Sequence, residues 1–218
     1  MKRIIVSAVI ASLLTPAIAS AAPPAERAKN NQAVREDKRE LANDRWDRAR
    51  LDNISAEYKD AIAKNQPKRL DAIEDRFLAE LNLEIGESRV EVAEKQQEVN
   101  ASRREAGKER REVVRDVVKG RPVKAARDAA DHADDRRDLA DDRADNRREV
   151  ASLDRKLAIR ARFQALRGQK APAALTEKSG LIDQALQLAR AEVQGDKAEV
   201  REDRRERRED RRDNVRPD

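Results

Sequence analysis

The chain has 218 residues, of which 43% are charged and only 2% are aromatic, and it contains no cysteine. So few large apolar side chains exclude a wide globular interior, and the abundance of Ala, Leu and charged residues is typical of long helices and coiled coils. Because 49 basic residues nearly balance 44 acidic ones, the charges favour pairing along helices over a self-repelling, disordered chain.

The first residues have the features of a secretory signal peptide. Lys2 and Arg3 give it a positive start, residues 4–14 form a short apolar core, and Ala19-Ser20-Ala21 is a small-residue cleavage site. The pattern predicts that residues 1–21 are removed by cleavage after Ala21 and that the mature protein is periplasmic or secreted. No later segment approaches the roughly 20 apolar residues that span a bilayer, so no transmembrane anchor is expected.

Proline and glycine divide the remaining sequence into four predicted helices, because Pro favours the first turn of a helix and Gly the residue after its end. The breaks fall at Pro67, at Gly120-Arg121-Pro122 and between Gly168 and Pro172. The predicted helices span residues 25–64, 67–119, 122–167 and 173–214. Their short connections predict antiparallel neighbours.

The predicted fold class is therefore all-α. We expect one helical hairpin over residues 22–119 and a second over residues 120–214, the latter ending in a charged C-terminal helix. The last residues, 215–218, are expected to form a tail. The two hairpins would form a coiled coil or an extended four-helix bundle.

Apolar periodicity predicts which helix faces are buried. The second helix has an apolar stripe at steps of three, four and seven, consisting of Leu70, Ile73, Phe77, Leu81, Ile85, Val92, Val99, Ala106, Val113 and Val117. The third helix has an alanine series at similar steps, consisting of Ala126, Ala130, Ala133, Ala140, Ala144 and Ala151. Larger apolar residues concentrate near the first and third connections, in residues 51–92 and 150–193. An up-down-up-down bundle would bring these two segments to one end, which we expect to contain the core.

An acidic stripe follows one face of the third predicted helix. Its members are Asp128, Asp131, Asp135, Asp138, Asp142, Asp145 and Glu149, at alternating steps of three and four. A row of oxygen ligands for Ca²⁺ or Mg²⁺ is one interpretation. Pairing with the preceding, basic helix is favoured, because a fold at Gly120 sets Asp131 opposite Arg111, Asp138 opposite Arg104 and Asp135 near Lys108. The stripe is thus expected between helices, with no metal bound.

A basic run near the third connection, residues 155–170, contains no acidic residue. Cations in the last turns of a helix complement its macrodipole, and they also attract anionic surfaces. In the predicted bundle, basic residues of the first connection join this run. The possible anion- or partner-binding surface comprises Lys64, Lys68, Arg69, Arg155, Lys156, Arg160, Arg162, Arg167 and Lys170. Specific nucleic-acid binding is not expected, because aromatic stacking groups are nearly absent.

No motif of an enzyme is present. His132 is the only histidine and there is no cysteine, which excludes the common zinc sites and a Cys–His pair. Nucleophile elbows, phosphate loops and dinucleotide fingerprints are also absent. We therefore expect no catalytic residues and no cofactor.

Three functions remain compatible with the sequence. The first is a non-enzymatic scaffold or interaction module of the cell envelope that binds a protein partner or an anionic envelope component. Scarce apolar residues leave a single hairpin marginal, so a homo-oligomer is expected. The second is a holdase, because the outline is similar to Skp-type chaperones, which are basic, periplasmic and built on long helical hairpins. The third is a hydrophilic stress or desiccation protectant, which the charged, aromatic-poor composition also fits.

Overall fold

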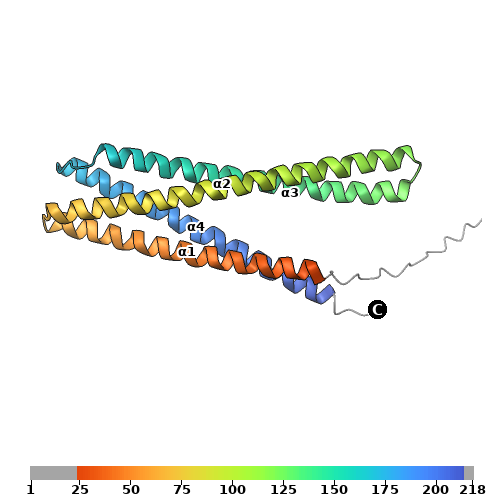
Figure 1. The fold of residues 1–218 in the computed structure, drawn as a ribbon, viewed down its shortest axis with the longest axis horizontal. Coiled ribbons are helices and arrows are strands. Elements are labelled where there is room, and N and C mark those ends of the chain that lie inside the picture. The colour runs from red at the N-terminus through yellow and green to blue at the C-terminus, as the bar shows by residue number, and fades with distance from the viewer. Residues whose placement is uncertain (1–23, 214–218) are drawn as a thin grey trace, which may run out of the picture. The chain divides into compact units, whose positions relative to one another are not determined.

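The computed structural model describes residues 24–213, so the predicted signal peptide, residues 1–21, and the predicted tail, residues 215–218, lie outside the described residues. Four helices follow one another along the chain (Figure 1): α1 (Pro24–Ala63), α2 (Pro67–Val118), α3 (Pro122–Ala165) and α4 (Pro172–Asp213). The predicted all-α class is confirmed, and every predicted helix boundary agrees with the structure to within two residues. No helix within residues 24–213 is long and apolar enough to cross a membrane.

Local backbone chemistry explains why the first two connections are tight. Asn65 (φ 50°) and Gly120 (φ 66°) adopt the left-handed conformation directly after α1 and α2. In each case the next residue donates its N–H to a carbonyl five positions back, Gln66 to Ala61 at 3.0 Å and Arg121 to Asp116 at 2.9 Å. This hydrogen-bond pattern is the Schellman motif, which satisfies the last carbonyls of a helix. A proline then occupies the first turn of α2 and of α3.

The residue contacts divide the chain into two units. One unit is formed by residues 44–193, and the other by the two chain ends, residues 1–43 and 194–218. Leu41 of α1 and Val200 of α4 are buried in the described part of the second unit. All features analysed below belong to residues 44–193.

Within residues 44–193, the helices pair in antiparallel fashion. Asp60 of α1 pairs with Arg69 of α2, and Arg50 of α1 pairs with Glu80 of α2. Residues earlier in α1 therefore contact residues later in α2, as in an antiparallel pair. The same inversion relates α3 and α4, because Arg162 pairs with Glu177 and Ser152 bonds Glu192. Lys170 pairs with Asp71, which places the first and third connections at the same end, as predicted (Figure 1).

The apolar core of this bundle lies at the end that the sequence predicted. Its buried residues come from two segments, 51–85 and 159–189. At the centre, the rings of Phe77 and Phe163 pack with their centroids 4.6 Å apart and tilted by 54°, and both side chains are fully buried. Such an aromatic pair contributes about 0.5–1.5 kcal/mol beyond the area that it buries. The core therefore joins α1, α2, α3 and α4 in this unit.

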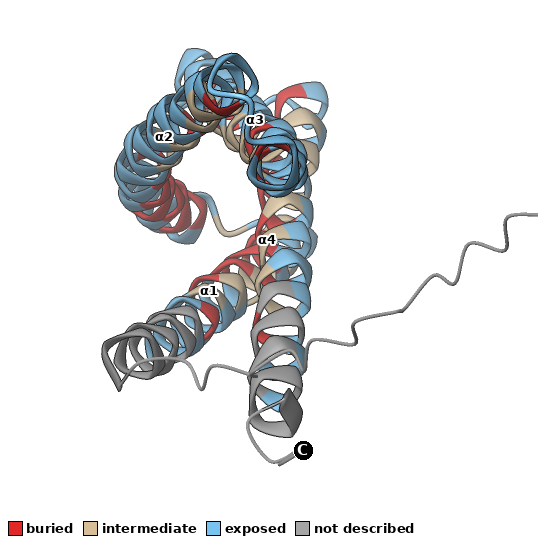
Figure 2. Cartoon of the chain, turned by 90° about the vertical axis from the view of Figure 1, so that its right-hand side faces the viewer, coloured by how far each residue is buried: buried red, intermediate tan, exposed pale blue. Residues whose placement is uncertain are grey.

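Beyond the core, α2 and α3 continue as a two-helix arm, which we define as residues 92–149. The α1–α2 register places Asp44, the first residue of the unit, opposite a residue near Gly86, and α3 meets α4 at Ser152 and Glu192. Within residues 44–193, the arm therefore consists of α2 packed against α3. Figure 2 shows that its loop end is mostly exposed, whereas buried residues gather farther along α2.

The predicted alanine seam of α3 is wrong. Five of its six members are exposed, and only Ala144 is half-buried. The buried face of α3 instead contains Ala125, Asp128 and Leu139, and nearer its C-terminal end Ile159 and Phe163. Because Ile159 and Phe163 must face the core, the rotation of the helix is fixed, and the alanines fall on another face. The predicted stripe of α2 is largely confirmed, since Leu70 to Ile85, Val99 and Ala106 are buried, although Val117 is exposed.

Candidate functional site

The nine basic residues of the predicted anion-binding surface lie in the bundle, where neighbouring helices neutralise most of them. Six form ion pairs: Lys64, Arg69, Lys156, Arg162, Arg167 and Lys170. Arg160 donates a hydrogen bond to Asn82 Oδ1 at 3.3 Å, and Lys68 and Arg155 are exposed. The acidic partners come from α1, α2 and α4, so the absence of acids within the basic run does not leave it uncompensated. Lys156 is buried, so its predicted place on this surface is wrong, because its ammonium lies between α2 and α4. Anion binding by the other eight residues stays a prediction.

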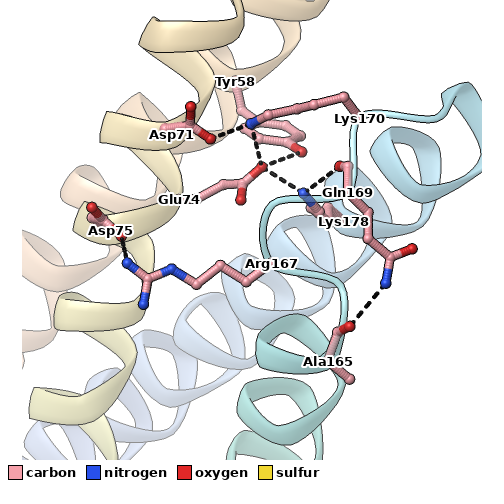
Figure 3. Close-up of polar contacts among 9 residues, drawn as sticks. All are labelled: Tyr58, Asp71, Glu74, Asp75, Ala165, Arg167, Gln169, Lys170 and Lys178. Atoms are coloured by element: carbon pink, nitrogen blue, oxygen red, sulfur yellow. Dashed lines mark hydrogen bonds and ion pairs between the residues drawn. The ribbon is translucent and has the colours of Figure 1, made fainter.

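A buried polar network joins the third connection to the start of α2 (Figure 3). Lys178 Nζ donates to Glu74 Oε1 at 2.6 Å and to the carbonyl oxygen of Gln169 at 2.8 Å. The Tyr58 hydroxyl reaches the same Glu74 oxygen at 3.4 Å, and Lys170 Nζ lies 3.7 Å from it. Lys178, Glu74 and Tyr58 are almost completely buried. The network therefore ties α1, α2, α4 and the connecting loop together.

The chemistry of this network is structural. Burial, with the negative charge of Glu74 added, raises the pKa of Tyr58 well above its usual value, so the phenol stays protonated and acts as a donor. Glu74 Oε1 already has three cationic or hydroxyl neighbours, while Glu74 Oε2 is buried without a hydrogen-bond partner. A buried ion pair of this kind fixes the arrangement of helices more than it adds stability.

A second buried network surrounds Lys156 of α3. Its Nζ donates to Glu84 Oε2 at 3.0 Å and to Ser88 Oγ at 2.9 Å, and it lies 2.9 Å from Glu192 Oε1. Burial alone would lower the pKa of Lys156, but the charges of Glu192 and Glu84 outweigh burial and raise it, so the ammonium stays charged. Burial raises the pKa of Glu84 to about 7 against the opposing effect of Lys156. One lysine thus links α2, α3 and α4.

Three buried carboxylates lie together where α1 faces α2. Asp47, Glu80 and Glu84 each contribute an oxygen, and these oxygens lie within 4.8 Å of one another. Arg50 Nε donates to Glu80 Oε1 at 2.5 Å, and Arg50 Nη2 contacts Asp47 Oδ1. Burial raises the pKa of Asp47, with Arg50 opposing the shift and Glu87 and Glu80 adding to it. We call Asp47, Glu80 and Glu84 the carboxylate cluster.

The sequence prediction missed both networks and the carboxylate cluster. The sequence contains many charged residues, and residue type alone does not distinguish the buried Glu74, Glu84 and Lys178 from exposed ones. A signal was nevertheless present, because Glu74 precedes Phe77 by three residues and Glu84 follows Leu81 by three, which puts both beside the apolar stripe. Only the register of distant helices shows which cation each one meets.

The acidic stripe of α3 partly faces the arm seam, as predicted, but its partners differ. Asp128 is buried, Asp135, Asp142 and Asp145 are half-buried, and Asp131 and Asp138 are exposed. No ion pair of the described residues joins the stripe to Arg104, Lys108 or Arg111. Instead, Lys124 of the same helix pairs with Asp128 at 3.1 Å, Arg148 pairs with Asp145, and Ser102 of α2 donates to Asp142 at 2.5 Å. The register across the arm is as expected, but the arginines extend into solvent.

The only histidine of the sequence lies on this arm. His132 lines a shallow surface depression together with Ala106, Gly107, Arg110 and Arg136, and its Nδ1 is buried without a hydrogen-bond partner. The lining contains two guanidinium groups and no hydroxyl or carboxylate. This set offers neither a nucleophile nor a carboxylate to orient the imidazole, so it does not form a catalytic triad.

Apolar side chains are displayed at the loop end of the arm. Val114, Val117, Val118 and Val123 are 58%, 62%, 81% and 70% exposed. Residues 111–128 contain six basic and three acidic residues, and the acid Asp116 is buried and held by Lys124 at 2.6 Å. We call residues 111–128 the arm tip. An exposed group of apolar residues surrounded by charge is typical of an interaction surface.

No protein-family model, curated protein or solved structure matched this chain.

Proposed function

We propose that the chain is a non-enzymatic, exported interaction module of the cell envelope that binds a protein partner through the arm tip. The observation that supports this proposal is the group of four exposed valines beside the α2–α3 connection. An exposed valine gains about 1.5–3 kcal/mol when it is fully buried, so a partner that covers several of them gains a useful binding energy.

The chemistry of the tip defines the partner. Its apolar centre requires an apolar patch, and its excess of exposed bases, among them Arg111, Lys119 and Arg127, requires an acidic rim around that patch. Basic rims accelerate association with acidic partners and do so less at high salt. Binding that weakens moderately with salt but is abolished by loss of the valines is therefore expected.

The test uses the full mature chain with a photo-crosslinking residue in place of Val118, and a second version with the same residue in place of Val90. Val90 is 57% exposed but lies outside the tip. The proposal predicts a discrete adduct in envelope extract from position 118, absent from position 90. Excess native chain must abolish this adduct by competition. Adducts that are equal at both positions, or resistant to competition, would contradict the proposal.

Two unlabelled variants, each added in excess, then test whether the valines are needed to compete for the partner. The tip variant combines Val117→Ser, Val118→Ser and Val123→Ser, and the control combines Leu83→Ser, Val90→Ser and Val150→Ser, which are exposed away from the tip. The control should compete as well as the native chain, and the tip variant should fail. If the competing partner is a second copy of the chain, sedimentation of the native protein should show association that the tip variant lacks.

A holdase is the second candidate, because exposed valines on a slender arm would also contact the apolar segments of an unfolded protein. In that case the native chain should suppress aggregation of an unfolded β-barrel membrane protein at equal molar ratio. The tip variant should lose this effect and the control variant should keep it. If both variants suppress aggregation equally, the arm tip does not bind the unfolded protein.

A further inference from the structure

The carboxylate cluster has more negative charge than its surroundings neutralise. Asp47, Glu80 and Glu84 are 3%, 8% and 6% exposed, and the half-buried Glu192 joins them through Lys156. Arg50 and Lys156 are the bases that contact these four carboxylates. When all groups are ionised, two negative charges remain in excess. Buried charges of one sign are costly unless a counter-charge accompanies them.

One oxygen of the cluster has no hydrogen-bond partner among the described residues. Glu84 Oε2 accepts a hydrogen bond from Lys156, but Glu84 Oε1 is fully buried and accepts none. Buried carboxylate oxygens in folded proteins normally bind a donor, a water or a cation. The unpartnered oxygen belongs to a side chain that reaches into the group of three ligand atoms. This oxygen and the excess charge together favour a positively charged ligand at the cluster.

We infer that Asp47, Glu80 and Glu84 form a binding site for one divalent hard cation, Ca²⁺ in preference to Mg²⁺, between α1 and α2. The donor set contains only carboxylate oxygens, which are the ligands of hard cations. Two charges on the cation match the two charges in excess.

The chemistry of the ligands favours Ca²⁺ over Mg²⁺. Mg²⁺ demands near-ideal octahedral geometry, keeps several waters and is usually bound by only one or two carboxylates, whereas Ca²⁺ accepts about six to eight oxygens in a flexible arrangement. Three protein carboxylates lie together here, with their oxygens within 4.8 Å of one another. Such a set suits Ca²⁺ better, and waters would complete its shell.

Arg50 acts as an internal competitor for this site. Its side chain is half-exposed and contacts Asp47 and Glu80, so it lies on the solvent side of the cluster and can turn outward. Removal of this guanidinium should strengthen cation binding, because the cation then has no rival. Glu84 is paired with Lys156 through its other oxygen and is not a ligand of Arg50 in the described structure. Arg50→Gln and Glu84→Gln therefore have opposite expected effects.

The single tryptophan gives a direct probe. Trp46 is adjacent to Asp47 in the chain, so Tb³⁺ bound in place of Ca²⁺ should emit when Trp46 is excited. With the full mature chain freed of metal by a chelator, we expect saturable emission at one Tb³⁺ per chain, reversed by Ca²⁺ at lower concentration than by Mg²⁺. Glu84→Gln should weaken Tb³⁺ binding at least about tenfold, since even groups that only support metal ligands contribute 10- to 100-fold.

Glu105→Gln is the matched control, because Glu105 is an exposed glutamate of the same helix outside the cluster. It should leave the emission unchanged, and Arg50→Gln should increase the affinity. A second readout is thermal unfolding followed by circular dichroism, in which Ca²⁺ should raise the Tm of the native chain but not that of Glu84→Gln. Should Glu84→Gln fail to fold, Glu80→Gln replaces it.

Several results would overturn the inference. Emission that rises without saturation, or that is the same in Glu84→Gln and Glu105→Gln, shows only non-specific attraction to an acidic surface. Stronger displacement by Mg²⁺ than by Ca²⁺ contradicts the preference for Ca²⁺. If lower pH raises the Tm but Ca²⁺ does not, these carboxylates bind protons and not a metal ion.

Discussion

The buried pair of Lys178 and Glu74 gives a prediction whose size follows from the structure. In Lys178→Met, the methionine fills a similar volume but removes the charge-assisted hydrogen bonds to Glu74 and to the Gln169 carbonyl. Removing one member of a buried ion pair costs about 3–5 kcal/mol, because the other charge is left buried. Here Tyr58 at 3.4 Å and Lys170 at 3.7 Å still contact Glu74, so the lower end, about 3 kcal/mol, is expected.

The assay is urea and thermal unfolding of residues 22–218, each followed by far-ultraviolet circular dichroism. A loss of about 3 kcal/mol corresponds to a Tm decrease of about 6–12 °C for a chain of this size. Arg162→Met is the control, because the Arg162–Glu177 pair is exposed, and its loss should cost less than about 1 kcal/mol.

The double variant Lys178→Met with Glu74→Gln tests the cause. A neutral amide keeps the hydrogen bond of Tyr58 and removes the stranded charge, so the double variant should regain about 1–3 kcal/mol relative to Lys178→Met. The reasoning is refuted if Lys178→Met is no more destabilising than Arg162→Met, or if the second substitution adds its own full loss.

Three further variants test the core, a connection and an ion pair. Phe77→Ala should cost about 3–5 kcal/mol in urea unfolding, because it leaves a cavity beside Phe163 in the only aromatic pair of the described residues, whereas Val117→Ser should change stability by less than about 0.5 kcal/mol. Gly120→Ala should cost about 1–2 kcal/mol, since φ is 66° and a Cβ meets no atom within 4 Å there, so only the backbone conformation opposes it; an unchanged midpoint would contradict this. Partial burial alone would raise the pKa of Asp183, but hydrogen bonds from Lys59 and Ser55 outweigh it and lower the pKa, so this carboxylate stabilises the fold above about pH 4 and loses that effect as the pH falls further. Asp183→Asn should therefore flatten the acid limb of stability against pH, and an unaltered limb would show that the hydrogen bonds contribute nothing.

The helices and their connections were predictable because the signals are local. Pro67 and Pro122 occupy first turns, and Gly120 and Gly168 take positive φ values that glycine accepts without strain. The position of the core was also predictable, because large apolar residues concentrate near two connections that an antiparallel bundle brings together. Each of these conclusions needs only a residue and its near neighbours.

The buried faces of α3 and the ionic partners were not predictable, because they depend on helices far apart in the sequence. The alanine series of α3 has a helical period, but Ile159 and Phe163 set the rotation of the helix and expose it. Likewise, Arg162 belongs to a run of bases, yet its acid, Glu177, comes from the next helix. Among so many charged residues, a sequence shows that pairs will form but not which ones.

Residues 44–193 fold as a bundle with a well-packed apolar core at one end and a weakly packed arm at the other. The core buries Phe77, Phe163 and many aliphatic residues, whereas the arm seam includes Asp128, Ser102 and Asp142. Regions with few buried apolar contacts open at lower free energy than the core.

Native-state hydrogen exchange of residues 22–218, resolved by mass spectrometry of peptides, measures this difference directly. Amides in residues 51–85 and 159–189 should exchange most slowly, at the rate of global unfolding, and those of residues 99–142 should exchange faster while remaining slower than an unfolded chain. Uniformly fast exchange along the whole chain, as a disordered protectant would give, or an arm protected as strongly as the core, would contradict the account.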